Sequence, residues 1–399
     1  MRWLRLIGGL LTVGIVLLGG GIAVIMGTDW WIHHHDRVEA AERYTTPGAA
    51  PASPKDTLTV MTWNIKFGGA RIDFFFDCYG DRVIMTETEV LQNLAGLLRK
   101  IRQVNPDILL IQELDRFSRR SAYIDMLKYI ADSAGLPYAV YASQWDVQYL
   151  PKKGLGRINS GNAIFSRWPI DAAIRWPLPL VKSYPWWYRE FYLRRNLLIA
   201  RIRHPHLPHL WVINTHLEAY VPYPDSTRYF QLQILKHFLD SLSQAGAVWI
   251  AGGDLNTVPP GTKKLKDFDD NACKDVDPTF VADDYTREVN WLLPFYQAYR
   301  EVIPLEVYQA REEDYYSHTV NSRGWWNRRL DYLFTNGYWI EGMVHQDSSK
   351  GGMETFPLSD HAPVVGRWTF PEDSINNTNL PQTANSTGKR PMSPQRRGI

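Results

Sequence analysis

The sequence contains few cysteines and little net charge, and each scarcity excludes a class of protein. Only two of its 399 residues are cysteine, Cys78 and Cys273, and they lie far apart. The chain is therefore neither a disulfide-rich miniprotein nor a zinc-thiolate protein. The two thiols either pair or stay free. A net charge of +2 provides no strong field for a polyanionic partner.

The remaining composition is that of a globular protein with an unusual number of aromatic residues. Hydrophobic residues make up 45% of the chain and charged residues 22%, which is enough apolar material for a core. The length leaves room for one α/β domain of about 250–300 residues between two terminal segments. The chain has 16 Trp and 21 Tyr, so we expect aromatic rings to serve more than the core.

Charge is also absent from a long run near the N-terminus. The run extends from Leu6 to Met26 and follows Arg2 and Arg5. About 20 apolar residues match the thickness of a bilayer core, whereas the apolar region of a cleaved signal peptide has about 7–15. We therefore expect residues 1–27 to be an uncleaved, single-pass membrane anchor rather than a signal peptide. The two arginines then place the rest of the chain on the exoplasmic or periplasmic side.

Changes in composition divide the rest of the chain. Residues 28–56, which include PGAAPASP, have the composition of a linker. Residues 57–371 are expected to form the folded domain. Residues 372–399 have almost no large apolar side chains, and we expect a disordered tail.

Two strand–helix–strand units follow one another in the folded domain. The first has a strand over 57–65, a helix, and a buried strand over 107–115. Thr86 and Glu89 have the spacing of a capping box, which begins the helix, and Asn105 with the proline after it ends the helix.

The second unit has the same order. A strand ends at His216, a helix begins at Ser226, and a buried strand occupies 247–256. Two more apolar strands, RRLDYLF and LSDHAPVVGRW, come later, and each carries an acidic residue.

Polar side chains gather at the ends of these strands. Any one of them could form a turn or cap a helix, and an isolated Asp-His pair could simply face water at a strand edge. In α/β proteins, however, ligands bind at the carboxyl ends of strands, so the accumulation indicates an active site. The residues are Asn64, Glu113, His216, Asp254, Asn256, Asp331, Asp360 and His361.

The motifs that carry these residues resemble those of a known superfamily. TWNIKFGG, IQELD, SGNAIFSRWPI, NTHLEA, GGDLNT, RLDYLF and SDHAPV occur in the order found in the endonuclease/exonuclease/phosphatase superfamily. This superfamily includes DNase I-like nucleases, inositol-polyphosphate 5-phosphatases and bacterial neutral sphingomyelinases. The resemblance covers about residues 57–370. It implies a four-layered α/β/β/α sandwich, here preceded by one transmembrane helix.

The resemblance also implies a divalent metal, Mg²⁺ or Mn²⁺. Phosphoester hydrolysis needs a cation to neutralise charge on the phosphoryl oxygens. Glu113, Asn64 and Asp360 are the implied metal ligands, and their hard oxygen atoms suit Mg²⁺. No thiol ligand is available among them.

The other site residues take catalytic and phosphate-binding roles by the same resemblance. His216 would contact the scissile phosphate, and Asp254 would orient or deprotonate the attacking water. Asn256 would bind phosphate. His361 would be the second catalytic histidine, with Asp331 holding its ring in position. A binding module that had lost catalysis would lack the metal Glu or a catalytic His, and both are present.

The sequence departs from the family pattern at two places. DNase-type members carry a Tyr near the segment that here reads NSGN, residues 159–162. Asn162 would make a phosphate contact instead. Arg195 stands at the approximate place of a family Arg, although Arg194 could equally fill it.

Three aromatic segments, 71–80, 182–195 and 323–329, bear on the substrate. Their rings are either core or exposed, and exposed rings beside arginines either stack nucleobases or lie in a membrane interface. Because of the anchor, we favour a lipid-type phosphodiester or phosphomonoester. The alternative is a surface or periplasmic nuclease whose arginine clusters follow a nucleic-acid backbone. The sequence indicates no obligate protein partner.

Overall fold

The computed structural model describes most of the chain. The ranges are 2–33, 36–77, 80–150, 152–219, 225–268, 282–320, 324–347 and 354–370. Both cysteines and the expected tail lie outside the described residues.

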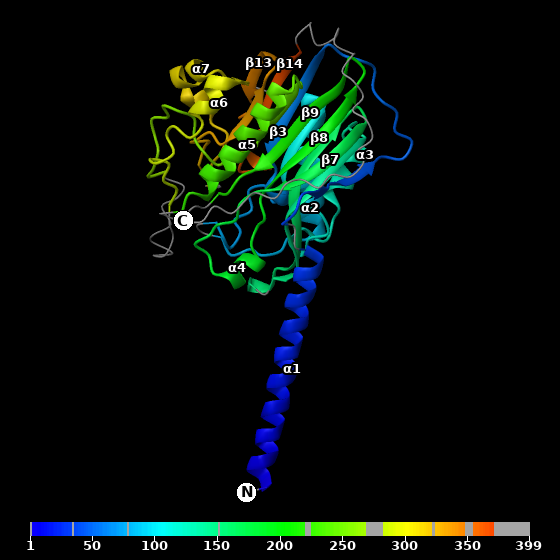
Figure 1. Ribbon diagram of the computed structural model, residues 1–399, viewed down its shortest axis with the longest axis vertical. Coiled ribbons are helices and arrows are strands. Elements are labelled where there is room, and N and C mark those ends of the chain that lie inside the picture. The colour runs from blue at the N-terminus through cyan, green and yellow to red at the C-terminus, as the bar shows by residue number, and fades with distance from the viewer. Residues whose placement is uncertain are drawn as a thin grey trace.

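Strands and helices are mixed along the chain, and two or three strands come in a row at several places (Figure 1). The helices are α1 (Arg2–His33), α2 (Glu87–Val104), α3 (Met126–Ser133), α4 (Trp186–Glu190), α5 (Thr227–Gln244), α6 (Leu293–Ala298) and α7 (Leu305–Ala310). The strands are β1 (Glu39–Ala40), β2 (Glu42–Thr45), β3 (Thr57–Asn64), β4 (Ile108–Asp115), β5 (Tyr138–Leu150), β6 (Gly156–Ser166), β7 (Ile170–Pro177), β8 (Asn196–His204), β9 (Leu207–His216), β10 (Trp249–Asp254), β11 (Arg300–Glu301), β12 (Asp331–Thr335), β13 (Tyr338–Val344) and β14 (Val364–Thr369).

The strands form two seven-stranded mixed sheets. The first has the order β1-β7-β8-β9-β10-β12-β11, and the second has the order β13-β14-β3-β4-β6-β5-β2. Each sheet contains one parallel pair, β9 with β10 and β3 with β4. These pairs correspond to the two strand–helix–strand units expected from the sequence, because a parallel pair needs a crossover such as a helix.

Apolar side chains from the facing surfaces of both sheets form the central core. Leu110 and Ile164 from one sheet belong to the same cluster as Leu198, Val212 and Leu333 from the other. Helices α2 and α3 pack on the outer face of the second sheet, and α5 and α6 pack on the outer face of the first. Helices therefore cover the outside of both sheets.

The capping box expected before α2 is confirmed. Thr86 accepts a hydrogen bond from the backbone of Glu89, and the Glu89 carboxylate accepts one from the backbone of Thr86. Asn105 ends the helix in the left-handed conformation, with φ of 54°. Both ends of α2 are thus determined by local residues.

The N-terminal helix α1 projects from the domain (Figure 1). Its segment Ile7–Val24 is long and apolar enough to cross a membrane, and none of that segment is buried against the domain. An N-terminal helix of this kind is either a signal peptide or an anchor. It runs to His33, which is six residues beyond the anchor expected at 1–27.

The segment expected to be a linker, 28–56, differs from that expectation. β1 pairs with β7, and β2 pairs with β5, so this segment adds an edge strand to each sheet. Residues 39–45 are therefore part of the sheets. Only residues 34–38 separate the end of α1 from β1.

Candidate active site

The predicted site residues meet at one end of the two sheets. Asn64 ends β3, His216 ends β9 and Asp254 ends β10. Glu113 lies two residues before the end of β4, at an irregularity in its pairing with β6, and has φ of 55°. The parallel pairing of β3 with β4 and of β9 with β10 brings these carboxyl ends to the same edge.

Asp331 and His361 reach the same place from the other direction. Both were expected at strand ends, but Asp331 begins β12 and His361 precedes β14. β12 is antiparallel to β10, and Asp331 is the direct partner of Asp254. An antiparallel neighbour presents its first residue where the other strand presents its last. Asp331 and His361 therefore lie at the expected end of the sheets, although they stand at the starts of their strands and not at the ends.

Asp254 lies at the centre of the site. Its Oδ2 atom is 3.5 Å from His216 Nε2, 3.5 Å from His361 Nε2 and 3.1 Å from Asn64 Nδ2. Its Oδ1 atom accepts a hydrogen bond of 3.0 Å from the backbone N–H of Asn256. Burial raises the pKa of Asp254 to about 7, although the His361 charge opposes the shift.

His361 forms a buried pair with Asp331. His361 Nδ1 lies 2.7 Å from Asp331 Oδ2, which also accepts a hydrogen bond of 2.7 Å from Ser317 Oγ. Burial lowers the pKa of His361, but the Asp331 and Asp254 charges outweigh burial and raise it to about 10. Asp331 and Asp254 therefore favour the protonated form of the His361 ring.

Glu113 and Asp360 provide the second group of carboxylates. Burial raises the pKa of Glu113, and the Asp360 charge adds to the shift. Asn64 Nδ2 donates a hydrogen bond of 3.1 Å to Glu113 Oε1. Burial and the Asp360 charge make the ionised form of Glu113 costly, a bound cation would relieve that cost, and the hard oxygens of both carboxyl groups suit Mg²⁺. Glu113 and Asp360 therefore fit the expected metal, whereas Asn64 presents its Nδ2 to this group and its Oδ1 accepts a hydrogen bond of 3.0 Å from the backbone of Lys66.

A second acidic and imidazole cluster offers ligand atoms within 4.8 Å of one another: Asp254, Asp331 and His361. In this cluster His361 Nδ1 already makes its bond to Asp331, and a protonated imidazole has no lone pair for a metal. A metal bound there would require His361 to lose its proton. The Glu113 and Asp360 pair contains no imidazole, although the Lys66 ammonium lies 3.8 Å from Asp360 Oδ2.

The phosphate-binding predictions fall around this centre. Asn256 lies beside Asp254 and donates to Leu217 O at 3.1 Å. Asn162 is buried on β6, 3.5 Å from Asn196 Oδ1, and its own Oδ1 has no partner. Its direct neighbour is thus another amide rather than a site carboxylate.

The two candidate arginines differ in position. Arg194 pairs with Asp36 and Glu190. Arg195 is buried and bonds Gln144 Oε1 at 3.3 Å, and its charge contributes, after burial, to lowering the pKa of His216. Arg195 is therefore the arginine close to the site.

Two residues beside the dyad were not expected from the sequence. The His318 ring is centred 4.2 Å from that of His361, and Ser317 contacts Asp331 as described above. Both lie in the stretch SHT, which has no recognisable spacing to the other motifs. An antiparallel bridge between His318 and His361 brings them together.

Lys66 was also missed. It lies within the TWNIKFGG motif, two residues after Asn64, and its buried Nζ is 2.9 Å from Asp77 Oδ2 and 3.8 Å from Asp360 Oδ2. A lysine within a strand-end motif gives no sign of burial. Its partner Asp77 belongs to the aromatic segment that we considered only for substrate binding.

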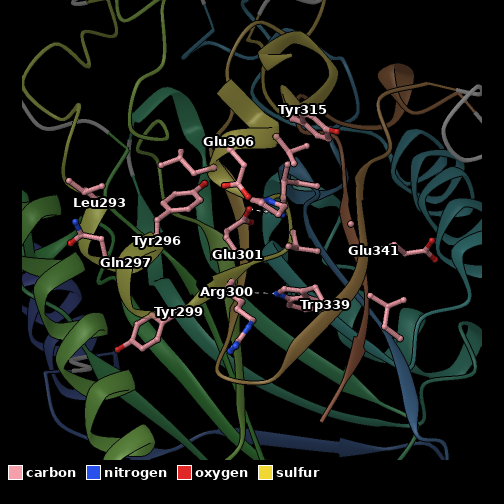
Figure 2. A pocket seen from close by; sticks show the side chains of 17 residues that line it. Leu293, Tyr296, Gln297, Tyr299, Arg300, Glu301, Glu306, Tyr315, Trp339 and Glu341 are labelled. Atoms are coloured by element: carbon pink, nitrogen blue, oxygen red, sulfur yellow. Dashed lines mark hydrogen bonds between the residues drawn. The ribbon is translucent and has the colours of Figure 1, made fainter. Parts of the chain in front are cut away.

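A cavity of about 530 Å³ lies elsewhere in the molecule, between α6, β11, α7 and β13. Figure 2 shows Tyr296, Glu301 and Trp339 in its lining. β11 pairs with the far end of β12, where Arg300 opposes Thr335. The cavity is therefore separate from the cluster around Asp254.

The fold and site define a phosphoester hydrolase, with carboxylates, histidines and amides at the strand ends of two packed sheets. The chain belongs to the endonuclease/exonuclease/phosphatase family, whose model matches residues 61–361. This confirms the family indicated by the motifs. Enzymes of this family hydrolyse phosphoester bonds and use divalent metals.

One solved structure supports the fold with a TM-score above 0.5. The endonuclease/exonuclease/phosphatase from Beutenbergia cavernae matches with a TM-score of 0.54 and 21% identity over 80% of this chain and 76% of that chain. The human Nocturnin catalytic domain matches at 0.49 and 15% identity, over 83% and 97%. Truncated TDP2 from Caenorhabditis elegans matches at 0.43 and 18% identity, over 78% and 98%. No curated protein sequence matches the chain.

Proposed function

We propose that the chain is a membrane-tethered hydrolase that uses Mg²⁺ or Mn²⁺ to cleave a lipid-type phosphodiester or phosphomonoester. The observation that carries the proposal is the position of Asp254, whose Oδ2 lies 3.5 Å from both His216 Nε2 and His361 Nε2. A carboxylate held between two imidazoles can orient a water molecule toward a phosphorus atom bound beside it.

Glu113, Asn64 and Asp360 would hold the cation. When bound, it neutralises charge on the phosphoryl oxygens and so favours attack by water. Asp331 keeps His361 charged and fixed in orientation, so that its Nε2–H can stabilise negative charge on the phosphoryl group.

Asp254 acts as the group that orients the water and accepts its proton. A pKa of about 7 suits this role near neutral pH, because the carboxylate is then both available and basic. Arg195, Asn256 and Asn162 would contact the phosphate oxygens.

The preference for a lipid substrate rests on α1 and on the pairing of several arginines with carboxylates. Arg116 is paired with Asp125, and Arg120 with Asp115. Arg203 is paired with Asp171. Arginines already held by carboxylates are poorly placed to follow a nucleic-acid backbone, which favours lipid over the alternative of a nuclease.

The alternative keeps one supporting observation. Phe76, Trp186 and Trp187 are exposed, and exposed rings stack on nucleobases in single-stranded substrates. A nuclease would use the same metal and the same catalytic residues.

The test is a parallel substrate screen with the full chain in detergent. Mg²⁺-dependent release from sphingomyelin, phosphoinositides and plasmid DNA is measured under the same conditions. Turnover of a lipid and little cleavage of DNA supports the proposal. The reverse order supports the nuclease.

A further inference from the structure

The end of the domain that carries the active site is also the end at which the chain arrives from α1. β1 is antiparallel to β7, with Glu39 opposite Arg175, two residues before β7 ends. The end of β7 is level with the start of β8, where Pro177 opposes Asn196. The neighbouring pair in β8 and β9 is Leu197 with Thr215, the residue before His216. The chain therefore enters beside the site.

The connection from α1 to this entry is short. Helix α1 ends at His33 and β1 begins at Glu39. Five residues span at most roughly 20 Å even when fully extended. α1 also contacts β5, and Asp36 pairs with Arg194, the residue before Arg195. Figure 1 shows α1 leaving the domain at the end where α4 lies.

Exposed aromatic residues occupy the same end. The segment between β7 and β8 leaves the sheet there and carries Trp186 and Trp187, which are 64% and 54% exposed. The hairpin between β5 and β6 extends beyond the site, because Ser160 in β6 opposes Asp115 at the end of β4. Tyr149 on this hairpin is 48% exposed.

The aromatic segment after β3 belongs to the same surface as the β5–β6 hairpin and the segment between β7 and β8. Phe75 and Phe191 pack on the apolar cluster near the turn of the hairpin, which includes Leu155. Phe76 next to Phe75 is 49% exposed. Lys152 and Lys153 lie exposed on the hairpin, with their Nζ atoms 5.6 and 5.3 Å from the Phe75 ring. We define the aromatic rim as Phe76, Tyr149, Lys152, Lys153, Trp186 and Trp187.

We infer that the aromatic rim docks on the bilayer in which α1 is anchored, so that the active site opens onto the lipid surface. Tryptophan and tyrosine side chains favour the headgroup region, and lysines beside them attract anionic lipids. The inference rests on the proposed function in one respect, because α1 must remain attached as an anchor. To the proposed function, the inference adds the surface from which the substrate reaches the active site.

The experiment measures the depth of single positions in the membrane. The full chain, with Cys78 and Cys273 replaced by Ser, is reconstituted into phosphatidylcholine vesicles containing about one fifth anionic lipid. An environment-sensitive fluorophore is attached through Trp187→Cys, and the matched control is Tyr338→Cys. Tyr338 is 45% exposed and pairs with Thr369 at the opposite end of the sheets.

Docking predicts that lipid-bound quenchers reduce emission at position 187 several-fold more than at position 338. Equal quenching at both positions overturns the inference. Hydrolysis of a soluble phosphodiester by the same labelled chain is recorded in parallel, so a failure of docking is distinguishable from a failure of the proposed activity.

A second pair of variants tests whether docking matters for turnover. The double variant Trp186→Ser/Trp187→Ser should lower the ratio of lipid hydrolysis to soluble-diester hydrolysis at least several-fold, and Tyr338→Ser should leave this ratio unchanged. If single-stranded DNA, rather than lipid, shields position 187 from an aqueous quencher, the aromatic rim is a nucleic-acid surface and the inference is wrong.

Discussion

His361 Nδ1 and Asp331 Oδ2 lie 2.7 Å apart in the interior of the site, and the remaining ring nitrogen of His361 faces Asp254. This pairing fixes the orientation of the His361 ring. We predict that His361→Ala lowers turnover by about 10²- to 10⁴-fold. Asp331→Asn should cost less. The double variant should be little worse than His361→Ala, because residues that act as a unit are not additive.

Turnover and thermal midpoint are measured for all three variants. A purely structural pair would give a modest loss of rate and a marked fall in the midpoint. Fully additive rate losses would contradict the dyad even if each residue proved important.

The second prediction concerns the metal. EDTA should abolish turnover, and Mg²⁺ or Mn²⁺ should restore it, because burial and the Asp360 charge oppose ionisation of Glu113 and a bound cation relieves this repulsion. Glu113→Gln should weaken Mn²⁺ binding at least tenfold, as measured by calorimetry, with little effect on folding.

The matched control is Glu341→Gln, since Glu341 is an exposed carboxylate on the edge strand β13. Full activity in metal-free buffer would exclude the metal assignment. If Asp331→Asn weakens Mn²⁺ binding more than Glu113→Gln does, the cation belongs at the cluster of Asp254, Asp331 and His361 instead.

The third prediction is a loss of stability in acid that originates at His204. Burial lowers the pKa of His204 to about 4, and the His206 charge adds to the shift. Both ring nitrogens face backbone N–H groups, of Lys55 at 3.5 Å and His206 at 3.2 Å; the neutral ring can accept from one of them, and a protonated ring from neither. The unfolded chain takes up this proton near pH 6.5. The stabilising contribution is therefore complete above pH 6.5 and is lost as the pH falls toward 4.

Chemical denaturation at pH 7.5 and pH 5 measures this loss. His204→Phe keeps an aromatic ring against Trp168 and should make the difference between the two pH values smaller. His209→Asn, at an exposed histidine, is the control. An unchanged difference in the His204 variant would assign the acid sensitivity to other groups.

The fourth prediction concerns topology. If α1 is an anchor oriented by Arg2 and Arg5, a reporter fused after Gly27 should be active only outside the cytoplasm. A cytoplasmic signal would contradict the orientation. Recovery of a soluble form that begins near residue 28 would show instead that α1 is a cleaved signal.

Local signals explain which parts of the fold could be predicted from the sequence. α2 was predictable because Thr86, Glu89 and Asn105 determine its ends without help from the rest of the chain. β10 was predictable as a buried apolar run that ends in Asp254. The ordered motifs then assigned the family, although each motif alone is weak.

The remaining features depend on partners distant in the sequence. β1 has only two residues and β2 four, and each forms because the edge of a sheet is already in place. The direction of β12, and therefore the place of Asp331 at its start, is set by pairing with β10. His318 reaches His361 through a bridge between segments 43 residues apart (361 − 318).

The last prediction concerns Lys66, whose buried ammonium group lies between the aromatic segment and the metal-side carboxylate. Its Nζ contacts Asp77 Oδ2 at 2.9 Å, Ile72 O at 3.2 Å and Asp360 Oδ2 at 3.8 Å. Burial lowers the pKa of Lys66, but the Asp360 and Asp77 charges outweigh burial and raise it. Lys66→Met would leave two carboxylates without their counter-charge. Removing one partner of a buried ion pair costs about 3–5 kcal/mol, so the thermal midpoint should fall by several degrees or more.

The double variant Lys66→Met/Asp77→Asn separates this charge effect from simple loss of packing. Removing the unpaired carboxylate as well should recover part of the lost stability, because the remaining site then buries one negative charge fewer. Losses that add, with no recovery in the double variant, would show that Lys66 acts through the packing of its alkyl chain. Thermal unfolding of the two single variants and the double variant decides between these outcomes. Asp77 also accepts a hydrogen bond of 2.8 Å from the backbone of Phe74. If the double variant recovers stability but not turnover, Asp77 holds the aromatic segment in place through Lys66.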